Sequence, residues 1–162
     1  YHIQGSDRSK IKLGAFYKNR LVAVMTFSAR RISLGAKPKA NAFELTRFCT
    51  ISNFNIVGIA SKLLRYFEIN FKPTEIISYA DRRWSNGNLY KKIGFSLDHI
   101  SAPNYWYLKE YIQRIHRFSF RKNILKEKLD CFDNNLTEWQ NMQNNGYDRI
   151  WDCGNLVFRK SY

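Results

Sequence analysis

The sequence is poor in acidic residues and in cysteine, and it contains no long apolar run. Its 162 residues include 13 Asp and Glu against 27 Lys and Arg, which gives a formal net charge of +14 at pH 7. No stretch approaches the roughly 20 apolar residues of a membrane-spanning helix, and no signal peptide is visible at the start. These absences favour a cytoplasmic protein and make a membrane the weaker candidate partner.

The three cysteines, Cys49, Cys131 and Cys153, are odd in number and far apart in the chain. They form no CxxC pair and no Cys/His spacing of the kind that binds zinc. We therefore expect ordinary buried thiols in a reducing compartment, and no metal.

Apolar side chains and positive charge are both abundant. A hydrophobic content of 44% and an aromatic content of 16% predict a packed core, and the length suits one domain with room for a small appendage. A surplus of cations this large favours a polyanionic partner, with nucleic acid as the first candidate and a merely soluble basic protein as the alternative. The chain begins with Tyr1 rather than Met, so we expect a longer parent protein.

Strand-like and helix-like segments alternate along the first two thirds of the chain. Two apolar runs at 12–18 and 20–28 meet at Lys18-Asn19-Arg20, which predicts a β-hairpin. The same kinds of pattern predict further strands at 43–50, 75–80 and 104–108, and a short helix at 88–93.

A small-residue turn precedes an amphipathic helix between residues 55 and 71. Leu63, Leu64, Phe67 and Phe71 recur there at helical spacing. The free N–H groups of a helix's first turn favour an anion, so the turn is a candidate pyrophosphate cradle. It is neither a Walker loop nor a GxGxxG turn, and the alternative is a glycine that only permits tight helix–sheet packing. The candidate cradle comprises Asn55, Ile56, Val57, Gly58, Ile59, Ala60 and Ser61.

The segment Leu89–Phe95 reads Leu-Tyr-Lys-Lys-Ile-Gly-Phe. Together with the cradle it resembles the GNAT acetyltransferase fold, in which a Gln/Arg-x-x-Gly-x-Gly/Ala turn grips the pyrophosphate of acetyl-CoA. The resemblance spans 13–108 and implies an α/β fold with a mixed, mostly antiparallel sheet flanked by helices. It also implies CoA or acetyl-CoA as the cofactor and Tyr90 as general acid toward the departing thiolate. Asn55 departs from the Gln or Arg of the family pattern.

A second resemblance rests on Phe43–Phe48 and Ile77–Trp84, where Glu-Leu-Thr-Arg is paired with Ser-Tyr-Ala-Asp. These segments are similar to Mom-type phage proteins that modify adenine in DNA, and to C-terminal domains of phage homing endonucleases with a Vsr-like nuclease domain. The resemblance implies catalytic roles for Arg47, Asp81 and Ser78, and a nuclease domain before Tyr1. The alternatives are a structural ion pair for Arg47 and Asp81, and a solvent-facing strand position for Glu44.

Two functions follow from these resemblances. The first is a DNA-binding or targeting module of a homing-endonuclease-like protein, which the altered Asn55 and the heavy charge favour. The second is an acyl-CoA-dependent transferase that modifies a DNA base, which Tyr90 and the pair of Arg47 and Asp81 favour. An acetyltransferase for small molecules or proteins is disfavoured by the charge of +14.

Basic side chains near aromatic ones are the expected contacts to nucleic acid. They come from an expected exposed loop at 30–40, from the end of the 75–80 strand, and from a basic region at 114–129 whose apolar residues have helical spacing. The alternative for Trp84 is core packing. The candidates are Arg30, Arg31, Arg82, Arg83, Trp84, Arg117, Arg121, Lys122 and Lys126.

The composition changes after about residue 109. We therefore expect residues 1–110 to form the GNAT-like domain and residues 111–162 to form a basic helical extension packed on it. Within the extension, Thr137-Glu-Trp-Gln140 is a capping-box pattern that opens a short helix, which Gly146 ends. Residues 149–159 are expected to form a final hairpin or strand pair.

Overall fold

The computed structural model describes residue 5 and residues 8–30 and 40–162, so most of the expected loop at 30–40 lies outside it. The chain divides into two compact units. Unit 1 comprises residues 1–101 and 155–162, and unit 2 comprises residues 102–154. This division differs from the expected boundary at 110, because the last strand returns to the sheet of unit 1.

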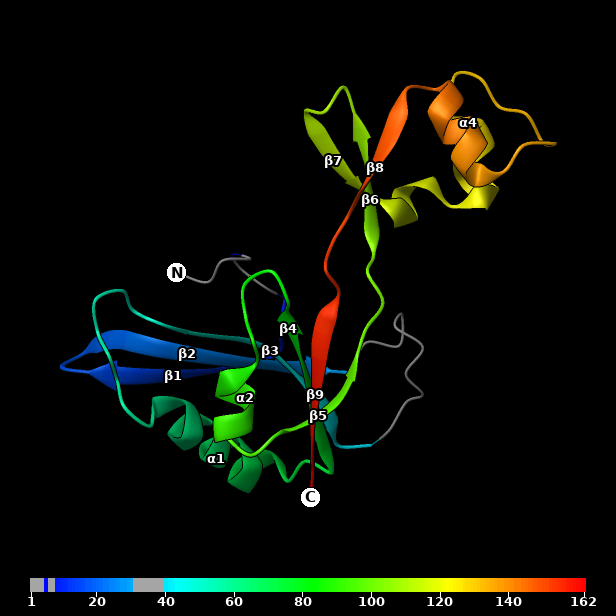
Figure 1. Cartoon of the computed structure of the whole chain (residues 1–162). Helices are drawn as coiled ribbons and strands as arrows, with labels where there is room; N and C mark the ends of the chain where they lie inside the picture. The colour runs from blue at the N-terminus through cyan, green and yellow to red at the C-terminus, as the bar shows by residue number, and fades with distance from the viewer. Residues whose placement is uncertain (1–4, 6–7, 31–39) are drawn as a thin grey trace. The chain divides into compact units, whose positions relative to one another are not determined.

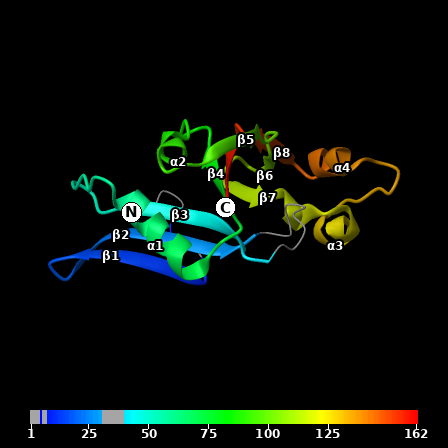
Figure 2. The same ribbon diagram turned by 90° about the horizontal axis from the view of Figure 1, so that it is seen from below.

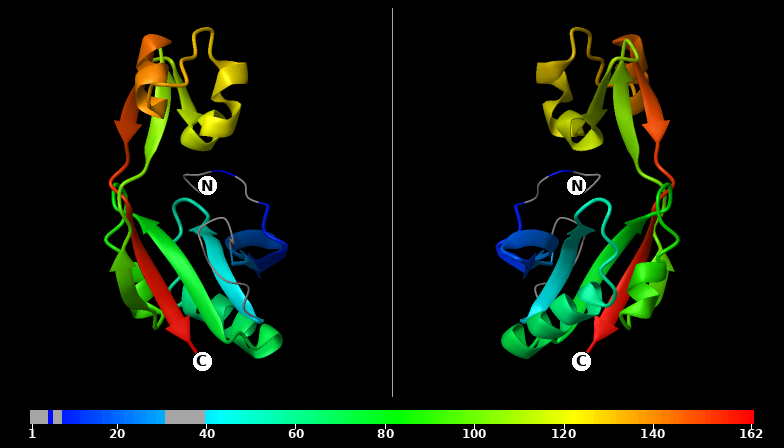
Figure 3. Two further views of the ribbon diagram at one scale, coloured as in Figure 1. Left: turned by 90° about the vertical axis from the view of Figure 1, so that its right-hand side faces the viewer. Right: turned by 90° about the vertical axis from the view of Figure 1, so that its left-hand side faces the viewer.

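Unit 1 is built on a six-stranded sheet with the order β1-β2-β3-β4-β9-β5 (Figure 1). All neighbouring strands are antiparallel except β3 and β4, which are parallel. The final strand β9 therefore lies between β4 and β5, as Figure 3 shows in red between green strands. The strands are β1 (Ile11–Tyr17), β2 (Arg20–Ala29), β3 (Ala42–Thr50), β4 (Glu75–Asp81), β5 (Ser96–Ile100) and β9 (Asn155–Ser161).

The expected hairpin is present as β1 and β2. Lys18 and Asn19 between the strands both have positive φ, 46° and 61°, as a two-residue type I′ turn requires. This turn fixes the register in which Tyr17 faces Arg20.

Two helices cover one face of the sheet with a single apolar core. They are α1 (Ile59–Phe71), seen against the strands in Figure 2, and the short α2 (Asn88–Lys92). Leu63, Leu64 and Phe67 of α1 are buried, as their spacing predicts, and Phe67 stacks on Phe27 of β2 with ring centroids 3.6 Å apart. The amphipathic helix and its apolar face are thereby confirmed.

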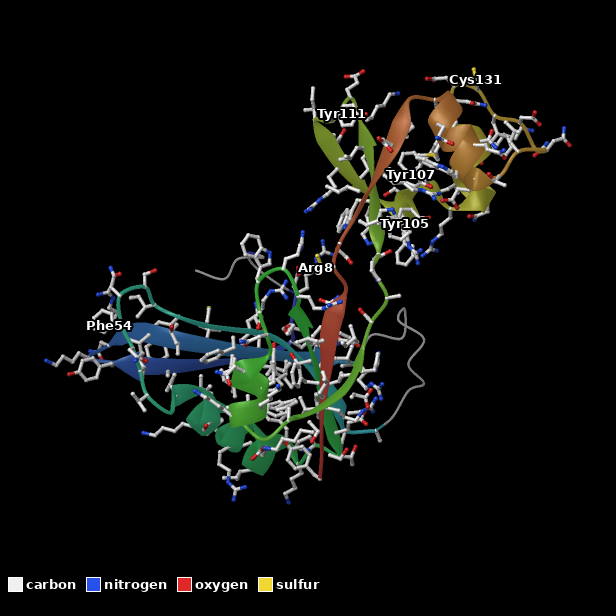
Figure 4. All side chains as sticks on the ribbon, in the orientation of Figure 1. Arg8, Phe54, Tyr105, Tyr107, Tyr111 and Cys131 are labelled. Carbon is white, nitrogen blue, oxygen red and sulfur yellow. The ribbon has the colours of Figure 1, made fainter. Side chains whose placement is uncertain are left out.

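Unit 2 has its own sheet and its own core. The sheet has the order β7-β6-β8, from β6 (Tyr105–Lys109), β7 (Gln113–His116) and β8 (Tyr147–Trp151). Tyr107 of β6, labelled in Figure 4, packs with Phe120, Leu125, Leu129 and Met142. The capping box at the start of α4 (Glu138–Asn144) is confirmed: the Gln140 N–H donates to Thr137 Oγ1 and the Thr137 N–H donates to Gln140 Oε1.

The prediction of a helical basic region at 114–129 is wrong. The segment instead contains β7, two 3-10 turns (Arg117–Phe120 and Lys122–Ile124) and one α turn, α3 (Leu125–Lys128). Arg121 between the 3-10 turns has extended backbone angles, φ −64° and ψ 145°, which interrupts any continuous helix. The apolar side chains of this segment still pack in the core of unit 2, because a series of short turns can direct them toward it as a helix would.

The strand pair expected at 149–159 also differs from the structure. β8 belongs to the sheet of unit 2, whereas β9 pairs with β4 and β5 in unit 1. The chain between them is held by Asp152, whose carboxylate accepts the N–H groups of Gly154 and Asn104, both at 2.8 Å. β8 and β9 are therefore joined by a connection that these hydrogen bonds hold, and not by a hairpin turn.

The charge is distributed very unequally over the two units. Residues 102–154 contain 8 Lys and Arg against 7 Asp and Glu, and the remaining 19 and 6 lie in unit 1. Unit 2 is thus close to neutral, at +1, and unit 1 carries +13. The expected basic extension, residues 111–162, contains 9 Lys and Arg against 6 Asp and Glu, so it is only weakly basic.

The exposure of the cysteines and the hydropathy of the helices can also be compared with the sequence-based predictions. The three cysteines are free, but Cys131 and Cys153 are exposed rather than buried. Within residues 8–30 and 40–162, no helix is both long enough and apolar enough to cross a membrane.

Candidate active site

The site lies where the two parallel strands part. Between β3 and β4 the ladder joins three residue pairs, from Ala42–Glu75 to Glu44–Ile77. One residue further along, the Ser78 hydroxyl donates a hydrogen bond of 2.8 Å to the Leu45 carbonyl oxygen. Ser78 therefore bridges the strands at the end of their ladder, where parallel strands in α/β sheets offer a ligand crevice at their carboxyl ends.

A glycine turn brings Tyr90 to this place. Gly87 precedes α2 with φ +76°, and the Ser85 hydroxyl accepts its N–H at 3.1 Å. A Cβ atom on Gly87 would lie 2.2 Å from the Phe158 ring, so the turn needs glycine for its close packing as well as for its φ. The Tyr90 ring then stacks on Phe158 of β9 at 5.0 Å and 21°. These contacts fix the direction of the Tyr90 hydroxyl.

Charged and polar groups of β3 and β4 surround that hydroxyl. Burial raises the pKa of Tyr90, while the Ser78 hydroxyl and the Arg47 charge lower it and the Glu44 charge raises it. The net direction is upward, so the phenol remains protonated at neutral pH and can donate its proton. The structure thus brings together three of the four predicted catalytic residues, Tyr90, Ser78 and Arg47.

Arg47 offers a cation with unused hydrogen-bonding capacity. Its Nη1 donates to the Thr46 carbonyl oxygen at 2.8 Å, and its buried Nε has no partner among the described residues. A register shift between Thr26 and Phe27 leaves Thr46 as an extra residue on β3. Such a bulge can re-aim a side chain, here that of Arg47. An anionic or carbonyl oxygen would satisfy the orphaned N–H.

Glu44 was missed as a site residue. We expected it to face solvent, yet it is only 3% exposed. It lies in the three-pair ladder of β3 with β4, and parallel ladders are commonly covered on both faces. Its position in the Glu-Leu-Thr-Arg segment was the available signal.

Asp81 has a different environment from the other predicted catalytic residues. Its carboxylate pairs with Arg83, with Nη2 at 2.6 Å and Nε at 3.1 Å. The side-chain hydrogen bond from Arg83 is the main reason that the pKa of Asp81 is lowered. The ion pair of Asp81 is therefore with Arg83 rather than with Arg47, and Asp81 is poorly suited to act as a base.

The candidate cradle at 55–61 has the features of an anion site. Gly58 stands at the N-cap of α1 with φ +73° and, being glycine, makes no side-chain cap hydrogen bond; the first turn of the helix holds no acidic residue. The space beside Gly58 is open, because a Cβ atom added to it would have no neighbour within 4 Å among the described residues. The Ile59 N–H of this 13-residue helix donates only a long hydrogen bond, 3.4 Å to the Ile56 carbonyl oxygen, and such a weakly paired helix start fits a phosphate. This fit supports a pyrophosphate-bearing cofactor in the cradle.

An open groove of about 520 Å³ follows the carboxyl end of β4, with Arg82, Trp84, Ser85, Asn86 and Leu156 as its lining. Trp84 is 69% exposed, so the alternative of core packing is wrong for this residue. An exposed indole beside an arginine can stack against a planar group. The groove is a candidate place for an acceptor.

The predicted nucleic-acid contacts have varied surroundings. Arg30 forms an ion pair with Glu75 at 2.7 Å, and the guanidinium of Arg121 lies 4.9 Å from the Phe118 ring. Arg117 stands over Tyr105 and Phe118, at 5.3 and 5.2 Å, and its Nε is buried without a partner among the described residues. Lys126 is exposed on α3. Arg31 and the side chain of Lys122 lie outside the described residues.

A metal centre has no support in the described part of the chain, where no group of three His, Cys, Asp or Glu side chains could hold an ion. The groups that this site does offer for chemistry are Tyr90, Ser78, Arg47 and the cradle.

Comparison with known proteins places the fold. No family model and no curated protein matches the sequence. Among solved structures, the PaiA N-acetyltransferase of Thermoplasma acidophilum, in complex with coenzyme A, is 18% identical with a TM-score of 0.50. The match covers 94% of this chain and 60% of that chain. The chain thus spans less than two thirds of the length of that acetyltransferase.

Two further structures agree. A GNAT-family acetyltransferase of Elizabethkingia anophelis with acetyl-CoA bound is 14% identical, with a TM-score of 0.50, over 93% of this chain and 75% of that one. A putative GNAT-family acetyltransferase of Desulfovibrio desulfuricans is 9% identical, with a TM-score of 0.51, over 93% and 67%. The chain therefore has the mixed α/β fold of GNAT acetyltransferases, as the Leu89–Phe95 resemblance implied.

Proposed function

We propose that the protein is an acyl-CoA-dependent acyltransferase. The observation that carries the proposal is the meeting of Tyr90, Ser78 and Arg47 where β3 and β4 part, within a fold shared with acetyltransferases. A protonated phenol, a hydroxyl and a guanidinium with a free N–H are what a thioester reaction can use as proton donor and oxyanion partners.

Each part of the site has a role in this proposal. The cofactor, acetyl-CoA or a related thioester, would supply an activated acyl group. Residues 55–61 would hold its pyrophosphate through the N–H groups at the start of α1. Tyr90 would hold a proton at its hydroxyl for the departing thiolate, and its raised pKa keeps that proton in place. Asn55 stands where the family has Gln or Arg, so backbone N–H groups would make the main contacts with the pyrophosphate.

Isothermal titration with acetyl-CoA tests the proposal, with Ser61→Glu and Ser61→Gln as matched variants. Ser61 is exposed in the first turn of α1. A glutamate there favours the helix dipole but repels a phosphate, so it should keep the fold and weaken binding roughly fivefold, since such a charge is worth about 1 kcal/mol. The neutral glutamine should bind like the native protein. An absence of heat with folded native protein would refute the proposal.

A second candidate function, DNA association, is favoured by the net charge of +14. A CoA-type ligand alone needs few cations, whereas a nucleic acid releases counterions for each Lys or Arg that meets a phosphate. DNA could then be the acceptor, with one of its bases modified as in Mom-type proteins. It could also be the target of a module of a homing-endonuclease-like protein that has lost transfer.

Duplex binding over a salt series, combined with the acetyl-CoA titration, separates these possibilities. A targeting module should bind DNA with affinity that falls steeply with salt and should give no heat with acetyl-CoA. A DNA-modifying transferase should do both. Duplex affinity that barely changes with salt would refute DNA association altogether.

A further inference from the structure

The β1–β2 hairpin carries charges of one sign only. From residue 8 to residue 43 the sequence contains no Asp or Glu. Lys12, Lys18 and Arg20 are exposed, and among the described residues no ion pair includes them. These three cations are therefore available to neutralise charges of a partner.

The end of the hairpin projects as a two-stranded ribbon. Pairing of β2 with β3 stops at Ala23–Thr50, and the Ile51 N–H adds one last bond, to the Val22 carbonyl oxygen at 2.9 Å. The ribbon from Phe16 to Leu21 continues past that point, at the left-hand end of β1 and β2 in Figure 1. It can enter a recess that the full sheet could not.

Apolar side chains on the ribbon are exposed and held in place. Phe16 is 69% exposed and Leu21 is 45% exposed. A Cβ on Gly14 would lie 2.9 Å from Leu21 and 3.2 Å from the Phe16 ring, so both side chains cover the bare glycine. An aromatic side chain over a strand glycine is a known way to stabilise a sheet. The ribbon thus presents an ordered apolar platform beside its cations.

We propose that the tip of this hairpin, residues 16–21, is the surface that contacts duplex DNA. The proposal rests on the proposed DNA association and gives it a location, one that differs from the Arg117–Lys126 region of unit 2. The major groove of DNA admits a two-stranded β-ribbon. Lys18 and Arg20 would meet phosphates, and Asn19 between them would face base edges.

A membrane is the other anionic partner that cations and aromatic residues can suggest, and the order of residues argues against it. The outermost positions of the hairpin are Lys18 and Asn19, the pair of Tyr17 and Arg20 comes next, and the apolar Phe16 and Leu21 stand further back. Insertion into a bilayer would bury the charges first, which is costly. A polyanion instead meets the charges first, as the ribbon presents them.

Fluorescence anisotropy with a labelled duplex over a salt series tests the proposal. The variant Lys18→Gln/Arg20→Gln removes two charges at the tip, and Lys91→Gln/Lys92→Gln removes two exposed charges on α2. The first variant should make the plot of log K against log salt less steep by about two, and the second should leave it unchanged. Phe16→Ser should weaken binding with little change of slope. Melting temperatures confirm that each variant is folded.

The outcomes separate this proposal from the association on which it rests. If the native protein binds with a steep salt dependence and the tip variant keeps the same slope, the hairpin assignment is overturned and DNA association stands. If the native protein shows no salt-dependent binding, both are overturned. Tighter binding at equal salt to vesicles of phosphatidylserine and phosphatidylcholine, or to a single strand of the same sequence, also overturns the duplex assignment.

Discussion

Two glycines with similar backbone angles, Gly58 and Gly87, should differ in how much stability is lost when each is replaced. Gly58 and Gly87 both stand before a helix at nearly the same φ, +73° and +76°, but only Gly87 is packed against a ring. Gly58→Ala should therefore cost about 1–2 kcal/mol, the strain of a left-handed residue. Gly87→Ala should cost a further 1–3 kcal/mol or so from overpacking against Phe158.

Urea denaturation of the two variants measures this difference, and Gly146→Ala serves as a second open-space control with φ +76°. Equal losses of stability at Gly58 and Gly87 would mean that the Phe158 ring moves aside. In that case the stack of Tyr90 on Phe158 does not hold the hydroxyl in place.

Tyr90 is the residue on which the transfer chemistry depends. Tyr90→Phe keeps the stack on Phe158 but removes the proton, so we expect unchanged acetyl-CoA binding and a rate of acyl transfer lower by roughly 10²–10⁴-fold. Thiol release from acetyl-CoA with DNA as acceptor measures the rate, and calorimetry measures the binding. Tyr66→Phe, on the exposed side of α1, is the control. A rate for Tyr90→Phe equal to that of the native protein would exclude Tyr90 as the acid.

At the same scale, the sequence could predict Tyr90 but not the neighbourhood of Glu44. The Leu-Tyr-Lys-Lys-Ile-Gly-Phe segment carries a family motif, so its tyrosine is visible without a structure. Glu44 alternates with apolar residues in a strand, and alternation alone predicts a solvent-facing side chain. Its burial depends on a parallel partner that is more than 30 residues away in sequence, and no local pattern contains that information.

Whole elements were predictable where local signals agreed with the tertiary contacts. The Lys18-Asn19 turn, the face of α1 and the capping box of α4 are each set by residues within one or two turns of chain. The prediction for residues 114–129 was wrong because the spacing of apolar residues indicates which side chains are buried. It does not indicate whether an α-helix or a series of short turns buries them. The extended backbone of Arg121 breaks the helix there, and its own side chain lies over Phe118.

Glu68 of α1 ties two elements together and gives the fold a pH dependence. Its Oε1 accepts hydrogen bonds from Lys160 Nζ at 2.7 Å and from the Tyr162 hydroxyl at 2.6 Å. Burial raises the pKa of Glu68, but the hydrogen bonds from Lys160 and Tyr162 outweigh it and leave the pKa below its ordinary value of 4.5. The stability from this link is present above that value and is lost as pH falls through the lowered pKa.

Glu68→Gln should therefore lower the melting temperature at pH 7 and should converge on the native protein as the pH falls below the lowered pKa of Glu68. Thermal melts followed by circular dichroism across this range test the expectation. Glu127→Gln, an exposed position on α3, should run parallel to the native curve throughout. A constant gap between Glu68→Gln and the native protein down to the acid limit of folding would mean that the charge of Glu68 contributes nothing.

The organisation of the whole molecule is that of a sheet interrupted by an insertion. The strand order puts β9 between β4 and β5, although 53 residues of unit 2 separate β5 from β9 in the chain. The two cores share no residue, and the charge of the protein belongs almost entirely to unit 1. Composition alone placed the boundary near 110, because it could not register that the last strand, β9, rejoins the first sheet.

Unit 2 should for these reasons be removable. The Ser101 N–H donates to the Asn155 carbonyl oxygen at 2.9 Å, and the Asn155 N–H donates to Ser101 Oγ at 2.9 Å, so both ends of the insertion already form an antiparallel pair. Replacing residues 102–154 by Asn-Gly would join β5 and β9 through a two-residue turn. The shortened chain should melt within about 5 °C of the unit 1 transition of the full chain.

The shortened chain should also keep the acetyl-CoA heat, since Tyr90, Ser78, Arg47 and the cradle all lie in unit 1. Its duplex affinity should keep the salt slope of the full chain, because the proposed phosphate contacts, Lys18 and Arg20, lie in unit 1. A second version with a flexible Gly-Ser linker guards against a failure of the turn. If both versions fold but lose the salt slope, phosphate contacts reside in Arg114–Lys128 despite the neutrality of unit 2, and the charge partition would not predict where DNA binds.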